Sequence, residues 1–306
     1  MKKYGFGVDI GGTTIKLGLF ETSGKLIEKW EIPTRTEEKG AKILPDVAAA
    51  VRKKYKERGL HKEDIEGIGI GVPGPVDADG VVHGCVNLGW KTVDVVSAIS
   101  ALTGLQTAAA NDANIAALGE MWQGGGRGCE NVLMVTLGTG VGGGVIMDGR
   151  IAAGAHGAGG EIGHMTVDWL ETEPCNCGRK GCLEQYASAT GVVRLAKKHV
   201  TKFAEAENLT AKDIFDAAKS GDENACDVVF LMSRILGGAL ANVAVVCDPE
   251  IIVIGGGVSK AGDFLLDAVQ KQFEDRAFPA CKGTRFALAE LGNDAGIYGG
   301  MKLVLE

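Results

Sequence analysis

The sequence contains one glycine-rich pattern twice, and this repeat restricts the possible folds more than any other feature. Residues 4–20, YGFGVDIGGTTIKLGLF, read as a strand, a glycine-threonine turn and a second strand, and residues 131–147, NVLMVTLGTGVGGGVIM, follow the same plan. A shift of 127 positions aligns the two copies, so that Val8 corresponds to Val135. A polar turn and another strand candidate follow each copy. A repeated supersecondary unit indicates two similar domains that face each other.

The rest of the chain alternates between strand and helix patterns. Further strands are expected at residues 65–72, 106–110 and 251–254. Helices are expected at residues 40–58, 92–102, 112–122, 184–199, 211–219, 222–246, 262–274 and 295–305. This alternation predicts an α/β protein with mixed sheets.

The length of 306 residues favours two domains. We expect a smaller N-terminal α/β domain of residues 1–112 completed by residues 294–306, and a larger C-terminal α/β domain of residues 113–293.

Composition narrows the class of protein. The net charge is −7, which disfavours nucleic-acid and anionic-membrane partners and favours a cytoplasmic protein. The start of the chain lacks the apolar stretch of a signal peptide, and the longest uncharged run, residues 131–147, is too short and too glycine-rich for a membrane span. Glycine is abundant, 47 residues against 7 prolines, which predicts tight turns and backbone that approaches a ligand closely.

The tip of the first hairpin, DIGGTTIK at residues 9–16, has the character of a phosphate loop. Glycine N–H groups can point at an anion, and threonine hydroxyls add donors. Asp9 ends an apolar strand and is suited to hold Mg²⁺ through water. A plain hairpin with a solvated aspartate is the alternative, and a charge at the end of an apolar strand disfavours it. The expected nucleotide-binding residues are Asp9, Gly11, Gly12, Thr13, Thr14 and Lys16.

Two further glycine elements extend this prediction. Gly138, Thr139 and Gly140 offer a similar nest in the second copy, and two facing phosphate loops predict a nucleotide cleft. Gly256 and Gly257 lie between a strand and a helix, where a flat ligand such as adenine can lie against the backbone. A tight strand-to-helix turn is the alternative for this third element.

The string NDAN, residues 111–114, falls at a strand-to-helix junction. Asp112 suits a carboxylate that accepts the proton of a substrate hydroxyl as it attacks phosphorus, while Asn111 holds a neighbouring hydroxyl. The alternative is that Asp112 only caps the helix.

The most specific pattern is His164 followed by Cys175, Cys177 and Cys182. Three thiolates and one imidazole form a tetrahedral Zn²⁺ set, and a complete set leaves no position open for water, so we expect a structural zinc ion. Free surface cysteines are disfavoured because three exposed thiols would be prone to oxidation. A nucleic-acid-binding zinc knuckle is a further alternative, which the acidic charge opposes.

Glu161 and Glu184 flank this metal motif. Paired carboxylates accept hydrogen bonds from the hydroxyls of a polyol, and a metal ion nearby would fix their position. The alternative is that both are solvated surface glutamates, and the spacing alone supports the two interpretations equally.

Together these motifs resemble the ROK (repressor, open reading frame, kinase) family of sugar kinases. The resemblance runs from residue 5 to the last helix, and rests on DIGGTTIK (9–16), GVPGPVD (71–77), NLGW (87–90), NDAN (111–114), LGTGVGGG (137–144), GGEIGH (159–164) and CNCGRKGCLE (175–184). It implies the duplicated actin/hexokinase-like (ribonuclease H-like) fold, with two domains and a cleft between them. It also implies ATP with Mg²⁺, phosphorylation of a hexose hydroxyl, and a homo-oligomer, either a dimer or a tetramer.

The bacterial members that phosphorylate the 6-hydroxyl of glucose are the most similar. The resemblance makes Asp112 the general base. It gives the sugar contacts as Asn87, Asn111, Glu161, His164 and Glu184, and the zinc ligands as His164, Cys175, Cys177 and Cys182. The first phosphate loop begins within ten residues of Met1, so a preceding helix-turn-helix domain of the kind found in family repressors is not expected.

Three other functions remain open from the sequence. One is a kinase for fructose, mannose or an N-acylhexosamine such as N-acetylmannosamine or N-acetylglucosamine. The second is a non-catalytic sugar sensor, and the third is the zinc-knuckle nucleic-acid binder. ADP or polyphosphate in place of ATP as the phosphoryl donor also stays open.

Overall fold

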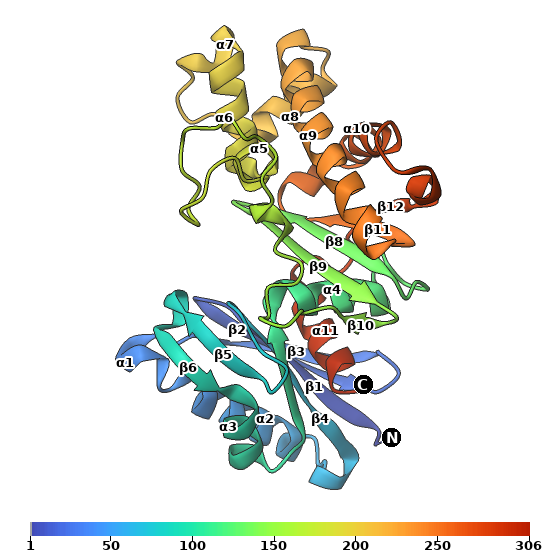
Figure 1. Ribbon diagram of the computed structural model, residues 1–306. Coiled ribbons are helices and arrows are strands. Elements are labelled where there is room, and N and C mark those ends of the chain that lie inside the picture. Colours follow the sequence, from blue (N-terminus) through green and yellow to red (C-terminus); the bar gives the residue numbers. More distant parts are fainter. Residues whose placement is uncertain (1) are drawn as a thin grey trace. The chain divides into compact units, whose positions relative to one another are not determined.

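The computed structural model describes residues 2–306, which form two compact units (Figure 1). One unit comprises Met1–Gly128, Gly149–Gly159 and Leu291–Glu306, and the other comprises Cys129–Asp148 and Gly160–Glu290. The first segment of the first unit ends at Gly128, beyond residue 112, and therefore contains the whole of the helix that begins at Asp112.

Each repeated hairpin lies in a five-stranded sheet, and the two sheets have corresponding strand orders. The first sheet has the order β3-β2-β1-β4-β7 and the second β10-β9-β8-β11-β12. In both, the two strands of the hairpin are antiparallel, and two strands from later in the chain extend the sheet in parallel: β4 and β7 in the first sheet, β11 and β12 in the second. The first sheet consists of β1 (Tyr4–Ile10), β2 (Thr14–Glu21), β3 (Leu26–Pro33), β4 (Ile65–Val72) and β7 (Thr107–Asn111). The second consists of β8 (Val132–Leu137), β9 (Val141–Met147), β10 (Arg150–Ile151), β11 (Ile251–Gly255) and β12 (Arg285–Leu288). The duplicated α/β fold predicted from the repeat is confirmed.

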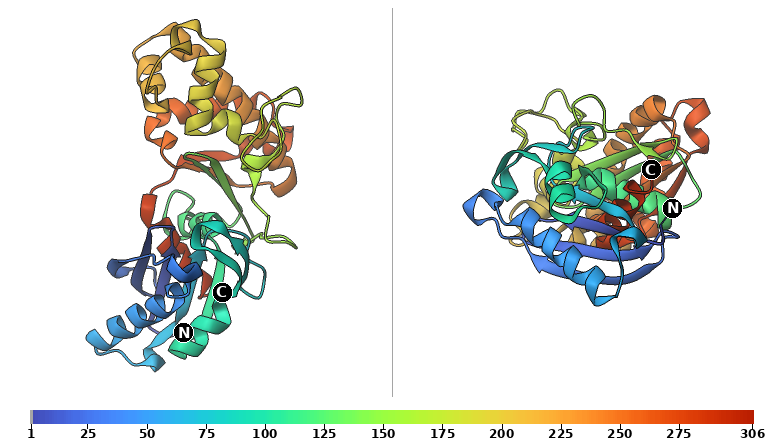
Figure 2. Two further views of the ribbon diagram at one scale, coloured as in Figure 1. Left: turned by 90° about the vertical axis from the view of Figure 1, so that its left-hand side faces the viewer. Right: turned by 90° about the horizontal axis from the view of Figure 1, so that it is seen from below.

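Helices complete both units (Figures 1 and 2). The first unit contains α1 (Glu37–Gly40), α2 (Ile43–Glu57), α3 (Val95–Thr103), α4 (Asp112–Gln123) and α11 (Ala295–Leu303). The second contains α5 (Glu184–Ala187), α6 (Ala189–His199), α7 (Thr201–Ala204), α8 (Ala211–Lys219), α9 (Glu223–Cys247) and α10 (Asp263–Glu274).

The sequence YGFGVDI explains how β1 serves both faces of its sheet. Successive side chains of a strand point to opposite faces. Phe6 and Val8 enter the apolar core that includes the buried residues of α2 and α3. Gly7 faces α11 instead, and a Cβ there would lie 1.7 Å from the carbonyl oxygen of Ile297. Asp9 lies on this second face, one residue before the end of the strand.

The long helix α9 belongs to the core of the second unit. Among the described residues, α9 is the one helix that is long and apolar enough to cross a membrane. However, 56% of its most apolar stretch is buried inside the protein. A core helix satisfies the same test, so α9 gives no support for a membrane span.

Capping residues change two of the predicted helices. The helix predicted at residues 92–102 begins at Val95, because Asp94 ends β6 (Trp90–Asp94) and caps α3 by accepting a hydrogen bond from the Ser97 backbone N–H. The helix predicted at residues 184–199 is two helices, because Ser188 leaves the helical conformation and caps α6 through the Gly191 N–H. β5 (Val81–Cys85), which pairs with β6, and β12 were not predicted.

Candidate active site

Asp9 places a half-buried carboxylate between two glycines of the first unit. Gly71 is its neighbour on β4, and Gly296 is in the first turn of α11. A Cβ on Gly296 would lie 2.7 Å from Asp9 Cγ, so only glycine leaves room for this carboxylate. Burial raises the pKa of Asp9, and the charge of Lys16 on the paired strand opposes that shift. A carboxylate that burial makes costly to ionise is well suited to a cation, and an oxygen ligand suits Mg²⁺.

The first glycine loop is held from the end of β3. Thr34 donates its hydroxyl to the Gly11 carbonyl oxygen at 2.7 Å and its N–H to the Thr13 carbonyl oxygen at 2.9 Å. Gly12 and Thr13 themselves are exposed. Lys16 does not extend into the loop, because its Nζ donates to the Asn293 carbonyl oxygen at 2.9 Å, just before α11. The loop therefore presents exposed backbone on a fixed support.

Asn111 and Asp112 occupy the junction of β7 and α4 as predicted, but their capping roles differ from the simplest interpretation. Asn111 is the cap, and its Oδ1 accepts from the N–H groups of Ala113 at 2.9 Å and Asn114 at 3.2 Å. Its Nδ2 donates to the Gly74 carbonyl oxygen at 3.1 Å. Asp112 is the first residue of the helix and is half-buried. The positive end of the helix dipole stabilises a negative charge at this position.

The β5–β6 hairpin brings Asn87 to the first glycine loop. Asn87 is exposed in the short 3₁₀ turn Val86–Leu88. A Cβ on Gly12 would lie 4.0 Å from the Asn87 Cβ. Burial raises the pKa of Cys85 at the end of β5, and the nearby negative charge of Asp112 adds to that shift. The first unit thus gathers the loop, Asn87 and Asp112 around one hairpin.

The second glycine loop connects β8 and β9 and is held by the start of α6. Gly138 donates its N–H to the Gly140 carbonyl oxygen at 2.9 Å, which closes a tight turn. Ala189 donates its N–H to the Gly138 carbonyl oxygen at 2.8 Å, and Thr190 donates its hydroxyl to the Thr139 carbonyl oxygen at 2.9 Å. Thr139 is exposed at the tip.

The third glycine element borders a cavity in the second unit. Gly256 has φ +88°, and a Cβ there would lie 2.6 Å from the Leu137 carbonyl oxygen, so this position requires glycine. No atom lies within 4 Å of the place where a Cβ on Gly257 would be. The adjoining cavity of about 290 Å³ includes Ala211, Phe215, Gly257, Val258, Lys260 and Ala261 in its wall. The sequence pointed to the glycines but not to Phe215 or the other residues of α8, which carry no motif.

The predicted metal ligands come together in the second unit. One ligand atom from each of His164, Cys175, Cys177 and Cys182 lies within 4.8 Å of every other. Cys177 Sγ is 3.7 Å from Cys182 Sγ, and Cys175 Sγ is 3.9 Å from His164 Nδ1. A tetrahedral ion with Zn–S bonds of about 2.3 Å separates its ligand atoms by about 3.8 Å. The four residues fit a Zn²⁺ ion in both chemistry and spacing.

Glu184 connects this ligand set to the second glycine loop. Its Oε1 lies 3.6 Å from Cys175 Sγ, and its Oε2 accepts a hydrogen bond from the Val141 N–H at 3.1 Å. A Cβ on Gly140 would lie only 2.1 Å from that Oε2. Glu161 is exposed just before the short 3₁₀ helix Ile162–His164, and its carbonyl oxygen accepts from the His164 N–H. The second unit thus places the Glu184 carboxylate beside Cys175, and the backbone of Glu161 beside that of His164.

Comparison with known proteins agrees with this arrangement. The family model described as "ROK family" matches residues 5–306. The chain belongs to the ROK family. A glucokinase from Halalkalibacterium halodurans is 47% identical over 98% of this chain and 94% of its own length. An N-acetyl-D-glucosamine kinase from Haemophilus influenzae is 30% identical over 98% of this chain and 99% of its own length.

Solved structures of ROK proteins have the same fold. A ROK hexokinase from Thermus thermophilus matches with a TM-score of 0.82 and 31% identity, over 98% of this chain and 97% of that one. A ROK glucokinase from Streptomyces griseus, solved with glucose and AMPPNP, matches with a TM-score of 0.75 and 33% identity over 98% of both chains. These matches show a sugar kinase of the ROK family, while the matched proteins differ in the sugar that their names state.

Proposed function

We propose that this ROK kinase is a glucokinase, which transfers the γ-phosphoryl group of ATP to the 6-hydroxyl of glucose. The observation that carries the proposal is the half-buried Asp112 carboxylate in the first turn of α4, beside Asn111 and near the hairpin that bears Asn87. The glucokinase from H. halodurans supports glucose as the sugar, and the AMPPNP complex of the S. griseus enzyme supports ATP as the donor.

Asp112 serves as the general base in this reaction. As the bond from the sugar oxygen to the γ-phosphorus forms, the hydroxyl proton passes to the Asp112 carboxylate. The bond between the γ-phosphorus and the bridging oxygen breaks at the same time, and ADP leaves. A negative charge is favoured in the first turn of a helix, so this position suits a carboxylate that accepts the proton and orients the hydroxyl.

Hydroxyl recognition is divided between amides and carboxylates. Asn87 and Asn111 in the first unit, and Glu161, His164 and Glu184 in the second, are the proposed sugar contacts. The Glu184 carboxylate is directed by the Val141 N–H, so it offers a fixed acceptor to a sugar hydroxyl. A fixed acceptor strengthens sugar binding because the side chain loses little conformational freedom when the sugar binds.

Nucleotide binding uses the three glycine elements. The exposed backbone at Gly12 and Thr13 and at Thr139 provides donors for phosphate oxygens. Asp9 would hold Mg²⁺, which neutralises charge on the transferred phosphoryl group. The cavity beside Gly257 has the size and the largely apolar wall that an adenine ring requires.

The Cys₃His set would hold a structural Zn²⁺ ion. The four residues would fill all four coordination positions of the ion, which would then offer no position to substrate. Its proposed contribution is to fix His164 and the loop that leads to Glu184.

We further propose that the enzyme works in the cytoplasm as a homo-oligomer, a dimer or a tetramer, without nucleic-acid or membrane partners. The resemblance to the family supports the oligomer, and the net charge of −7 supports the absence of polyanionic partners. Light scattering on the purified protein measures the oligomeric state.

A second candidate is an N-acylhexosamine kinase, which the similarity to the H. influenzae enzyme supports. A coupled assay over glucose, mannose, fructose, N-acetylglucosamine and N-acetylmannosamine, with ATP as donor, separates the two by kcat/KM. A higher kcat/KM for an N-acylhexosamine than for glucose would refute the glucokinase assignment.

The base assignment is tested with Asp112→Asn. General base catalysis is worth about 10²–10⁴-fold, so kcat should fall by that factor while the glucose Kd, measured by calorimetry, changes little. Asp79→Asn is the matched control, because Asp79 is an exposed aspartate of the same unit. A variant at position 112 that keeps more than a tenth of the wild-type kcat would refute the role of Asp112.

A further inference from the structure

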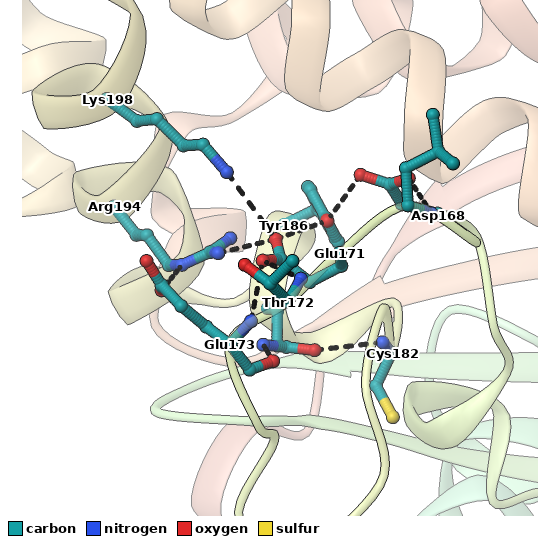
Figure 3. Close-up of polar contacts among 10 residues, drawn as sticks. Asp168, Glu171, Thr172, Glu173, Cys182, Tyr186, Arg194 and Lys198 are labelled. Atoms are coloured by element: carbon teal, nitrogen blue, oxygen red, sulfur yellow. Dashed lines mark hydrogen bonds and ion pairs between the residues drawn. The ribbon is translucent and has the colours of Figure 1, made fainter.

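Glu171 is a fully buried glutamate in the loop between His164 and the three cysteines (Figure 3). Its side chain has no exposed surface. Oε1 accepts hydrogen bonds from the backbone N–H groups of Thr172 at 2.9 Å and Glu173 at 3.0 Å. Oε2 accepts from the Tyr186 hydroxyl at 2.7 Å and forms an ion pair with Arg194. These partners hold the Glu171 carboxylate in one position. Removing one of them would destabilise the fold strongly, because a buried charge would lose its compensation.

The partners of Glu171 come from two other elements. Tyr186 is on α5, two residues after Glu184, and Arg194 is on α6. The Arg194 guanidinium lies over the Tyr186 ring at 5.5 Å, and the Tyr186 hydroxyl is also 2.9 Å from the Asp168 carboxylate. The cluster of Glu171, Tyr186 and Arg194, which we call the Glu171 latch, therefore joins the cysteine-bearing loop to two helices (Figure 3).

The helix that carries Arg194 also holds the second glycine loop. Thr190 precedes Arg194 by four residues, so the two side chains are on the same face of α6. Thr190 donates to the Thr139 carbonyl oxygen, whereas Arg194 pairs with Glu171. One helix face thus supports both the proposed phosphate loop and the loop that bears the metal ligands. Thr190, Arg194, Cys175 and Glu184 also share one small cavity.

None of the three side chains of the latch is a metal ligand. The ligands His164 and Cys175 lie on either side of Glu171 in the sequence, so a loop already shaped by the latch brings them together before metal binds. Shaping the loop in advance reduces the conformational entropy lost on binding, which favours retention of the ion. The same contacts fix α5, and Glu184 is the first residue of that helix.

We propose that the Glu171 latch positions the metal loop and the Glu184 carboxylate, so that Tyr186 and Arg194 are positioning residues for both zinc retention and sugar affinity. This inference rests on the proposed function of Glu184 as a sugar contact. It assigns the latch no contact with sugar, nucleotide or metal.

The main test is Tyr186→Phe, which removes one hydroxyl and keeps the buried ring. Loss of a hydrogen bond to a charged group should accelerate zinc release roughly tenfold, measured with a chromogenic chelator on the zinc-loaded protein. The glucose Kd, measured by calorimetry, should rise by a similar factor, while the Kd for MgAMPPNP stays within about twofold. Tyr55→Phe is the matched control, because Tyr55 is a buried tyrosine of α2 in the other unit.

A second pair of variants tests the ion pair. Arg194→Met removes the closer of the two cations that pair with Glu171 and leaves Lys198, whose Nζ is 3.7 Å from Oε2. It should weaken zinc retention and glucose affinity more than Tyr186→Phe does. Arg194→Lys restores a charge and should recover part of both losses. If Arg194→Met does not fold, zinc release and glucose affinity of Tyr186→Phe and Arg194→Lys still test the proposal.

Three results would refute the proposed role of the Glu171 latch. One is a wild-type protein that retains no zinc. The second is zinc release from Tyr186→Phe at the wild-type rate. The third is faster zinc release without a change in glucose Kd, which would make the latch a metal-loop element alone. These readouts do not involve phosphoryl transfer, so a wild-type protein that bound glucose without phosphorylating it would refute the proposed kinase activity and leave the test of the latch intact.

Discussion

Gly140 gives a direct test of whether the direction of the Glu184 carboxylate determines sugar affinity. A Cβ on Gly140 would lie 2.1 Å from Glu184 Oε2 and 3.1 Å from Cδ. The backbone of Gly140 is not in the left-handed region, so alanine is compatible with its conformation. Gly140→Ala therefore leaves the loop backbone in place and pushes the end of the Glu184 side chain away.

The structure also sets the size of the effect. The displaced carboxylate loses the hydrogen bond from the Val141 N–H at 3.1 Å. A hydrogen bond to a charged group is worth about 1.5–3 kcal/mol, which corresponds to a factor of roughly 10–150 in an equilibrium constant. We expect the glucose Kd of Gly140→Ala to rise within this range, because the sugar loses a preorganised acceptor.

Gly138→Ala is the matched control in the same loop. A Cβ on Gly138 would have only the Gly140 carbonyl oxygen near it, at 4.0 Å, so the added methyl group does not reach Glu184. Calorimetric glucose titrations of both variants give the comparison, and Glu184→Ala supplies the second axis of a double-mutant cycle. In the Glu184→Ala background the Gly140 substitution should change glucose affinity less than twofold. Equal glucose Kd values for the two glycine variants, or a full penalty without the Glu184 side chain, would refute the reasoning.

Three further predictions follow from buried groups. Asp9→Asn should stabilise the ligand-free protein at pH 7, because burial raises the pKa of Asp9 and the folded protein bears the cost of its charge above that pKa. The same substitution should remove the stabilisation of the protein by MgATP. Thermal unfolding with and without MgATP measures both effects. Gly299→Ala would place a methyl group 1.7 Å from a carbonyl oxygen of α4 and should lower the free energy of unfolding in urea by about 1–3 kcal/mol, whereas Gly283→Ala, with open space around it, should not. The Glu173 N–H and other partners hold the pKa of Glu171 well below its usual range, so its stabilisation is complete above the pKa of an unfolded glutamate, about 4.3, and is lost as pH falls towards the folded value. Calorimetric scans should show a steeper acid destabilisation of wild type than of Glu171→Gln, and parallel curves would contradict this.

Short-range patterns in the sequence were sufficient for the two repeated hairpins and for the cluster of three cysteines and His164. The glycine-threonine turns fix where each repeated hairpin reverses, and apolar residues flank them, so both hairpins were predicted. The Cys-Asn-Cys and Gly-Cys spacing likewise identified Cys175, Cys177 and Cys182, because residues close in sequence are close in space. His164 was found because it ends a short motif near them.

Contacts distant in sequence were not predictable in the same way. Glu171 looks like an ordinary surface glutamate in a polar loop, and its burial depends on Arg194, 23 positions later on another helix. Phe215 lines the cavity beside Gly257, yet its spacing on α8 is that of any buried helix residue. The β5–β6 hairpin was missed because Thr92 and Val93 fit either a strand or the start of the following helix, and the boundary depends on the cap at Asp94.

The glycine content shows how one composition signal can have two physical causes. We interpreted 47 glycines as turns and as backbone that approaches a ligand. Gly256 and Gly140 fit that interpretation, since each lies beside a proposed ligand site. Gly7 and Gly299 do not, because each removes a side chain where a helix backbone meets a strand or another helix. Such close contact holds α11 against the face of β1 that bears Asp9, so glycines that never meet a ligand still position the carboxylate proposed to bind magnesium.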